Sequence, residues 1–323
     1  MYNRLIKTTV SLFLVFIVLG GCGLSNNKSA EEKQNEILAP ADTVVTDQNP
    51  EETQSDIIEE NETEEIPEPE EINLINPSGE TLESRISVPD GYERISAEES
   101  SFTTFLRNYR MLPDGSAILL YDGREKSNRN AVCVFDMYLS DRDLQQCADS
   151  IMRIYAEYMR SAGKDDKIAF HFVDGFLCDW NSYKSGKRIK VDGNDVIWVN
   201  SAEPSDSDEV FETYLNAVFA FSSTLSMQEE CVPTELSDLK VGDVFIKGGS
   251  PGHVVMVADM CEKDGKKAFL LAQGYMPAQQ FHVLRNHKHD GDPWYYEDEV
   301  TYPFVTPEYT FCEGSLMHPV YLD

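Results

Sequence analysis

An α+β fold, with a mainly antiparallel sheet packed with two or three long helices, is the class that the sequence predicts. Two long helical patterns lie in the first two thirds of the chain, and apolar runs of strand length fill the last third. Helices that come first and strands that follow favour α+β over strict alternation of the two. Residues 72–323 are numerous enough to form one domain with a complete core.

The first elements of this region are a helix, two strands and a long helix. In SAEESSFTTFLRNY, Ser96 is a candidate N-cap, and Glu99 follows at the spacing of a capping box. Residues 116–123 and 130–139 are expected to be strands, because both are apolar and a turn-rich segment separates them. Residues 140–163 carry apolar side chains at helical spacing and end at a glycine, which predicts a long helix.

The second half of the domain begins with strands and a helix and ends with strands. Residues 167–180 are expected to be a strand leading into a turn, and residues 188–200 a hairpin around Asp-Gly-Asn. Residues 207–226 have the pattern of a second long helix. Four further strands are expected at residues 242–246, 253–260, 267–275 and 280–284.

The N-terminus resembles a bacterial lipoprotein signal. Arg4 and Lys7 precede the apolar stretch TTVSLFLVFIVLG, which is shorter than the roughly 20 residues of a membrane-spanning helix. Residues 19–22, LGGC, resemble the lipobox, which implies cleavage before Cys22, lipid on its sulfur and export. We therefore expect residues 1–21 to be a signal peptide and membrane lipid to hold the protein at the extracytoplasmic face of the cell membrane. An ordinary signal peptide or an N-terminal anchor is the alternative.

Residues 22–71 are expected to form a disordered acidic tether that follows the lipidated cysteine. Residues 31–71 contain sixteen acidic residues, one basic residue and no aromatic residue. Such a segment cannot bury enough apolar surface to offset its chain entropy, and its like charges extend it. A binding role for the acidic run is the alternative.

The charge of the remaining chain argues against nucleic acid as a partner. Residues 72–323 hold 41 acidic and 23 basic residues. Binding to phosphate groups needs clustered Lys and Arg, which so acidic a domain does not favour. Anionic lipid is a poor ligand for the same reason.

Neither a cofactor nor a metal site is expected. Six cysteines follow Cys22, but they are widely spaced and contain no CxxC pair, so their pairing stays open. His282, His287, His289 and Asp290 would have to converge to bind zinc, and a solvated loop is the preferred interpretation. No glycine-rich phosphate-binding loop occurs in the sequence, which leaves nucleotide chemistry unsupported.

Three long blocks resemble an uncharacterised bacterial lipoprotein family, the domain of unknown function 4846. They are DLQQCADSIMRIYAEYM, GDVFIKGGSPGHVVMVADM and FLLAQGYMPAQQFHVL, and the later PWY and TPEYTF fit as well. The resemblance extends from about residue 85 to the C-terminus. It implies a relationship and supplies no activity.

The same blocks are more weakly similar to papain-like, NlpC/P60-like cysteine hydrolases. In that group a cysteine lies near a helix start, a histidine begins a later strand, and a polar residue on the next strand orients the histidine. Here the matching residues would be Cys147, His253 and Gln273. Near a helix N-terminus and an imidazolium, the pKa of a thiol falls, and the thiolate can then attack an acyl carbon.

Substrate-binding residues are also suggested by these positions. Gln145 or Gln146 could stabilise an oxyanion, and Gly252 could allow close approach of a substrate or of the backbone. Trp294, in PWYYEDE, could stack on a sugar or peptide, although such a cluster is more often packing.

The cysteine also departs from the hydrolase pattern. NlpC/P60-like enzymes have Asp-Cys-Ser-Gly where this chain has Gln-Cys-Ala-Asp, and Cys147 falls on the apolar face of its helix. Two hypotheses therefore stay open. The protein is a cysteine amide hydrolase or transpeptidase acting on cell-wall peptides, or a non-catalytic surface module that binds another surface component, such as a protein.

Overall fold

The computed structural model describes residues 72–323, except residues 129 and 194. The expected signal peptide, the lipidated Cys22 and the tether lie outside the described residues. Among the helices that are described, none combines the length and the apolar character needed to cross a membrane.

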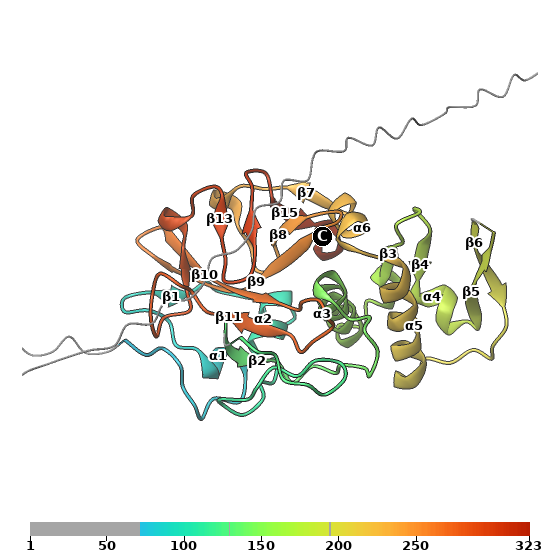
Figure 1. Ribbon diagram of the computed structural model, residues 1–323, viewed down its shortest axis with the longest axis horizontal. Helices are drawn as coiled ribbons and strands as arrows, with labels where there is room; N and C mark the ends of the chain where they lie inside the picture. Colours follow the sequence, from blue (N-terminus) through green and yellow to red (C-terminus); the bar gives the residue numbers. More distant parts are fainter. Residues whose placement is uncertain (1–71, 129, 194) are drawn as a thin grey trace, which may run out of the picture. The chain divides into compact units, whose positions relative to one another are not determined.

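A nine-stranded sheet organises the domain, and all of its neighbouring strands are antiparallel (Figure 1). The order is β2-β11-β10-β9-β8-β15-β7, while β1 pairs with β9 and β12 pairs with β10. The strands are β1 (Glu93–Arg94), β2 (Ala131–Val134), β7 (Cys231–Pro233), β8 (Val244–Lys247), β9 (His253–Lys263), β10 (Lys266–Gln273), β11 (His282–Leu284), β12 (Tyr295–Tyr296) and β15 (Leu316–Pro319). This sheet and its helices confirm the α+β class with a mainly antiparallel sheet.

Among the described residues, two helices are long and four are short. The long helices are α3 (Cys147–Ser161) and α5 (Asp208–Phe221). The short ones are α1 (Leu82–Arg85), α2 (Phe102–Arg107), α4 (Trp180–Lys184) and α6 (Thr224–Glu229). Single 3-10 turns occupy Asp165–Lys167, Leu236–Asp238, Glu297–Glu299 and Val320–Leu322. In Figure 1, α3 lies between the large sheet and the part of the chain that contains α4 and α5.

Three two-stranded hairpins complete the domain: β3 (Ala169–His171) with β4 (Leu177–Asp179), β5 (Lys187–Asp192) with β6 (Asp195–Asn200), and β13 (Phe304–Val305) with β14 (Thr310–Phe311). The second confirms the hairpin expected around Asp-Gly-Asn. The first differs from the single strand expected at residues 167–180, because the chain reverses at Gly175, whose φ of 85° suits a tight turn.

Several element boundaries differ from the sequence-based expectations. Helix α2 begins after Ser101, not Ser96, because the Ser101 side chain accepts a hydrogen bond from the amide of Thr104. Helix α3 begins only at Cys147, where the side chain of Asp149 accepts from the amide of Gln146. The strand expected at residues 116–123 forms only isolated bridges.

Helix α3 packs against β9 and β10 through its buried face. Ile151, Ile154 and Tyr155 on this helix are fully buried, and the Tyr155 hydroxyl donates to the carbonyl of Gly242 at 2.8 Å. Strand β9 is buried continuously over its first nine residues, so both faces of the sheet are covered there. The start of α3 is thereby held beside the centre of the sheet.

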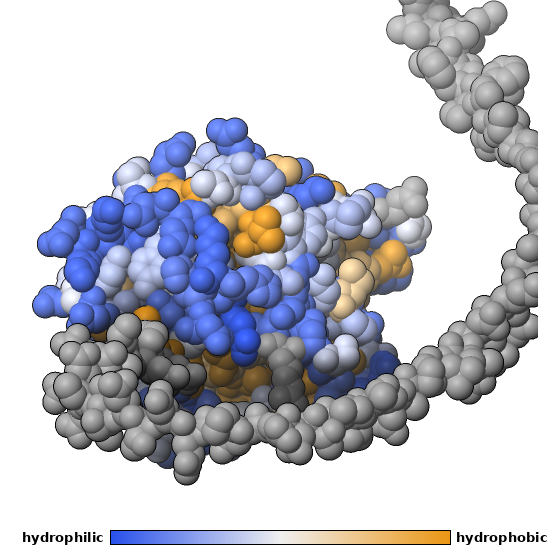
Figure 2. Space-filling model, turned by 60° about the vertical axis from the view of Figure 1, so that its left-hand side comes forward, coloured by the Kyte–Doolittle hydropathy of each residue, from blue (hydrophilic) through white to orange (hydrophobic). Residues whose placement is uncertain are grey.

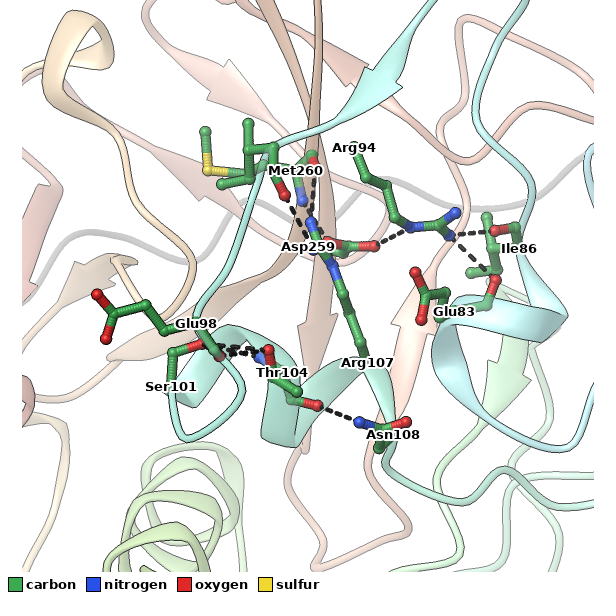
Figure 3. A network of polar contacts seen from close by, with 11 residues as sticks. Glu83, Ile86, Arg94, Glu98, Ser101, Thr104, Arg107, Asn108, Asp259 and Met260 are labelled. Atoms are coloured by element: carbon green, nitrogen blue, oxygen red, sulfur yellow. Dashed lines mark hydrogen bonds and ion pairs between the residues drawn. The ribbon is translucent and has the colours of Figure 1, made fainter.

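A buried carboxylate joins the N-terminal segments to β9 (Figure 3). Asp259 is fully buried, and its two oxygens accept from Arg94 and Arg107, each at 2.8 Å. Arg107 lies on α2 and Arg94 on β1. Two cations and good hydrogen-bond geometry offset the cost of removing this carboxylate from water.

The surface has no extended apolar face in the view of Figure 2. That side is largely hydrophilic, and its hydrophobic residues form small separate groups. Scattered exposed apolar side chains of this kind are normal for a folded domain and do not by themselves indicate a binding surface.

Candidate functional site

His253 and Gln273 meet at adjacent ends of neighbouring strands. His253 is the first residue of β9, and Gln273 is the last residue of β10. The Nε2 of His253 lies 2.7 Å from Oε1 of Gln273, and both side chains are buried. Since Oε1 can only accept, Nε2 carries the proton, and Nδ1 is left as the basic nitrogen.

Cys147 reaches the same place from the helix side. It is the first residue of α3, and its thiol is influenced by the amide groups of Ala148 and of Val254, the residue after His253. Gly274 allows this approach: a Cβ there would lie 2.4 Å from Oγ of Ser150 and 2.8 Å from the carbonyl oxygen of Gln146. A glycine after β10 thus lets the first turn of α3 contact the sheet.

A cleft of about 340 Å³ opens at this end of α3. Both Cys147 and His253 line it, whereas Gln273 lies behind the imidazole and does not. The other walls come from the segment between α5 and α6, the turn before β9, and two tyrosines. The sequence-predicted cysteine and histidine therefore share one cavity, and the predicted glutamine contacts the histidine.

The thiol of Cys147 and the imidazole of His253 are both neutral. Burial raises the pKa of the Cys147 thiol to about 12, and the neighbouring Asp149 adds to this effect. Burial lowers the pKa of His253 to about 4, while its hydrogen bond to Gln273 acts in the opposite direction. At neutral pH the pair is consequently a thiol and an imidazole rather than a thiolate and an imidazolium.

Aromatic rings surround the imidazole. The ring centroids of Tyr275 and Tyr309 lie 4.8 and 5.0 Å from that of His253. Lys126 lies 5.1 Å from the centre of the Tyr275 ring and forms a buried ion pair of 2.6 Å with Glu308. The imidazole is therefore shielded from bulk water, which explains its low pKa.

The two glutamines before the cysteine have different roles. Gln145 is buried, donates to the carbonyl of Tyr138 and accepts from Arg153 at 2.7 Å, so it is committed to the core. Gln146 lines the cleft, and its side-chain nitrogen Nε2 donates to Oδ1 of Asp143 at 3.1 Å. Of the two, Gln146 remains available as a donor to an oxyanion.

Gly252 and Trp294 also differ from one another. Gly252 lines the cleft, and a Cβ at this position would lie 2.4 Å from the hydroxyl of Thr224 and 2.3 Å from the carbonyl oxygen of Gly249. Trp294 is fully buried, donates to the carbonyl of Ser87 and does not line the cleft. The expectation that Trp294 stacks on a substrate is wrong, because its ring is part of the core.

The histidines near residue 282 do not converge on a metal. His282 is buried in β11, where its Nδ1 lies 3.0 Å from the carbonyl oxygen of Gln280. His289 pairs with Glu299. No group of three potential metal ligands is found among the described residues, and within that same region all six cysteines are unpaired.

Sequence reasoning missed several residues of the cleft, and three of them bear directly on its chemistry. Tyr275 and Tyr309 cover the imidazole, and Asp149 lies at the start of α3. Tyr275 is only two residues from the predicted Gln273, and this proximity in the sequence was a signal that could have identified it. Tyr309 comes from the distant segment before β14, and no local pattern indicates that it reaches the cleft.

The fold and the site define an α+β protein with a cysteine and a histidine at one cleft beside a helix N-terminus and a buried glutamine behind the histidine. The chain belongs to the family described as domain of unknown function 4846, whose model matches residues 82–318. No curated protein and no solved structure matches the sequence.

Proposed function

We propose that the domain is a cysteine hydrolase or transpeptidase of the papain-like kind that acts on amide bonds. Cys147 is the nucleophile, His253 the general base and acid, and Gln273 the residue that orients the imidazole. The observation that carries the proposal is the shared cleft of Cys147 and His253, with the Nε2 of His253 bound to Gln273 at 2.7 Å.

The hydrogen bond to Gln273 determines how protons would move. Because Nε2 holds its proton, Nδ1 of His253 accepts the thiol proton as the sulfur of Cys147 attacks the acyl carbon. The imidazolium then returns this proton to the leaving amine, and a thioester remains. Water resolves the thioester in hydrolysis, and a second amine resolves it in transpeptidation. Gln146 would stabilise the oxyanion of the tetrahedral intermediates.

The pKa values of Cys147 and His253 favour a second candidate function, that of a binding module without catalysis. A thiol with a pKa of about 12 beside an imidazole with a pKa of about 4 is poorly prepared to form an ion pair. The alternative is a non-catalytic surface module that keeps the cleft for binding or assembly. The hydrolase proposal requires that a bound substrate drive the proton transfer.

The proposal for location and substrate rests on the N-terminal sequence. Membrane lipid on Cys22 would hold the domain at the extracytoplasmic face, with the acidic segment as a tether. Cell-wall peptides are the amide substrates that such a position makes accessible. Labelling with a fatty-acid analogue should mark the wild-type chain and leave a Cys22→Ser variant unmarked and released from membranes; equal labelling of both would exclude this anchor.

The decisive experiment compares Cys147→Ala with Cys312→Ala. Cell-wall fragments are incubated with each purified protein, and new amino groups are identified by mass spectrometry. We expect Cys147→Ala to abolish release, because the nucleophile is lost, and Cys312→Ala to retain it, because that cysteine is exposed and lies outside the cleft. Thermal unfolding checks that both variants are folded.

Either of two results would favour the binding module. The wild-type protein could release no product from any fragment, or Cys147→Ala could keep the wild-type rate. For the module, Cys147→Ala would act only as a small truncation that costs about 1 kcal/mol of stability.

A further inference from the structure

Asp149 is unusual among the buried carboxylates of this domain. Its side chain is 6% exposed, and its Oδ2 accepts from the amide of Gln146 at 3.1 Å. Its Oδ1 is buried and has no hydrogen-bond partner among the residues that the structure describes. Leaving a buried acceptor unpaired is costly, so such a group indicates a missing partner.

Other buried carboxylates have cations or complete hydrogen bonding. Asp259 binds Arg94 and Arg107 (Figure 3), and Glu308 binds Lys126. The two oxygens of Asp292 accept from the amide of Trp294 and from the hydroxyl of Tyr296. Asp243, likewise buried, pairs with His318 at 2.5 Å. Among the buried carboxylates that the structure describes, Asp149 is thus the one with an oxygen left unpaired.

Asp149 lies in the wall of the cleft. Asp149 follows Cys147 by two residues, and its side chain folds back over the N-terminal end of α3 to reach Gln146. The charged residues among those that line the cleft are Asp143 and Asp149, and no lysine or arginine accompanies them. The domain as a whole is acidic as well. The two charged side chains that line the cleft beside the thiol are therefore both carboxylic acids.

We propose that Asp149 binds a primary ammonium group of the substrate, so that the cleft selects amides that carry a free amino group near the scissile bond. The inference rests on the proposed hydrolase function and names its substrate class. An ammonium group supplies both the hydrogen-bond donor and the positive charge that Oδ1 lacks. A carboxylate or phosphate at the same position would lack the positive charge that favours the ionised form of Asp149 and would therefore bind less well.

Ionisation of Asp149 would accompany binding. Burial raises the pKa of its carboxyl to about 8, against an ordinary value near 3.9, so the empty site is mostly uncharged at neutral pH. An opposite charge within about 4–6 Å lowers a carboxyl pKa by about 1–3 units. A bound ammonium would thus favour the carboxylate. Because Oδ1 is covered in this structure, binding also requires a shift of side chains at this end of the cleft.

Three methanethiosulfonates test the charge preference at the cysteine itself. The aminoethyl, methyl and sulfonatoethyl reagents are applied to the full chain carrying Cys312→Ser, and modification of Cys147 is followed by peptide mass. In each case the sulfur of Cys147 attacks the sulfenyl sulfur, a mixed disulfide forms and methanesulfinate leaves. Rates are divided by those of free cysteine with the same reagent, which removes intrinsic differences between the reagents.

We expect the normalised rate for the aminoethyl reagent to exceed that for the sulfonatoethyl reagent by about tenfold or more. Asp149→Asn should reduce the preference to about one, because the amide keeps the shape and loses the charge. Asp143→Asn is the matched control: Asp143 is exposed, so its loss should change the preference much less.

The outcomes separate this inference from the hydrolase proposal. Modification of Cys147 at equal normalised rates by all three reagents, or a preference that survives in Asp149→Asn, would overturn the role of Asp149 and leave the hydrolase proposal intact. No modification by any reagent would show a closed cleft and count against both. The comparison of the three reagents in the Cys312→Ser chain does not depend on Asp149→Asn, so a poorly folded Asp149→Asn does not prevent the test.

Discussion

The Nε2 of His253 donates a hydrogen bond of 2.7 Å to Oε1 of Gln273, and both side chains are almost completely buried. This contact selects one tautomer of the imidazole and directs Nδ1 away from Gln273. An orienting residue behind a histidine is needed for a cysteine nucleophile, since the base must face the thiol. In the proposed hydrolase, this contact would keep the basic Nδ1 of His253 available to the thiol, a role that a simple strand-end hydrogen bond would not have.

Replacing Gln273 with leucine should lower the turnover rate by at least about tenfold. General acid–base catalysis contributes roughly 10²–10⁴-fold, and without Oε1 the imidazole no longer has a preferred tautomer. Turnover of cell-wall fragments at saturating substrate is the measurement. Gln279→Leu is the matched control, because Gln279 is equally buried and is not a partner of His253. Equal losses in both variants would mean that Gln273 acts only through packing.

The pH dependence of alkylation should follow the high pKa of Cys147. With a pKa of about 12, the thiolate fraction rises about tenfold for each pH unit between pH 7 and pH 10. The rate of reaction with iodoacetamide at Cys147, measured by peptide mass, should rise in parallel. A plateau between pH 5 and pH 8 would instead reveal a preformed thiolate–imidazolium pair and contradict the neutral pair.

Asp149 should make the domain less stable as the pH rises. Its folded-state pKa of about 8 exceeds the value near 3.9 expected in the unfolded chain, so the folded state holds the proton more tightly. The stabilisation is complete below about pH 4 and is lost as the pH rises towards 8. Relative to wild type, Asp149→Asn should therefore gain stability between pH 4 and pH 8. Denaturant unfolding across this range tests it, and a pH-independent difference would contradict the raised pKa.

Local patterns were sufficient for the elements that carry the site. The apolar run after His253 and the run before Gln273 predicted two neighbouring strands, and they pair in the sheet as β9 and β10. The Asp-Gly-Asn turn predicted the β5–β6 hairpin. Alternation and turn chemistry act over a few residues, so they can be read without knowledge of the rest of the chain.

Partners that come from distant segments could not be predicted in this way. Arg94 and Arg107 reach Asp259 from 165 and 152 residues away. Trp294 is buried in the core, and Gln145 accepts a hydrogen bond from Arg153, although both residue types are also suited to a binding site. This packing determines which polar groups find hydrogen-bond partners inside the protein and which stay available to a ligand. The function of a residue depends on that difference.

The ion pairs of Asp259 should contribute strongly to stability. Asp259→Asn would leave two arginines facing a neutral amide inside the core, and breaking such a buried network costs about 3–5 kcal/mol. Asp298→Asn is the control, because Asp298 pairs with Lys266 at 2.8 Å on the surface, where solvent screens the charges, and this substitution should cost much less. Urea unfolding measures both. Similar costs for the two variants would show that the Asp259 network is not stabilising.

Gly274→Ala should damage the site more than the fold. The added Cβ would lie 2.4 Å from Oγ of Ser150, so the start of α3 must move away from β10 and carry Cys147 with it. Overpacking of this kind costs about 1–3 kcal/mol, whereas a displacement of 1 Å at a nucleophile can cost about 10²-fold in rate. The turnover rate and the stability towards urea are measured on the same preparation, and the loss in each is compared with wild type.

The contact between position 274 and Ser150 provides a control for this variant. Ser150→Ala removes the nearest atom, so the double variant Gly274→Ala/Ser150→Ala should recover part of the activity. Gly248→Ala, where the nearest atom lies 3.0 Å away at the end of a flexible glutamine side chain, should have a smaller effect. If Gly274→Ala retains the wild-type turnover rate, the close approach of α3 to β10 does not position Cys147.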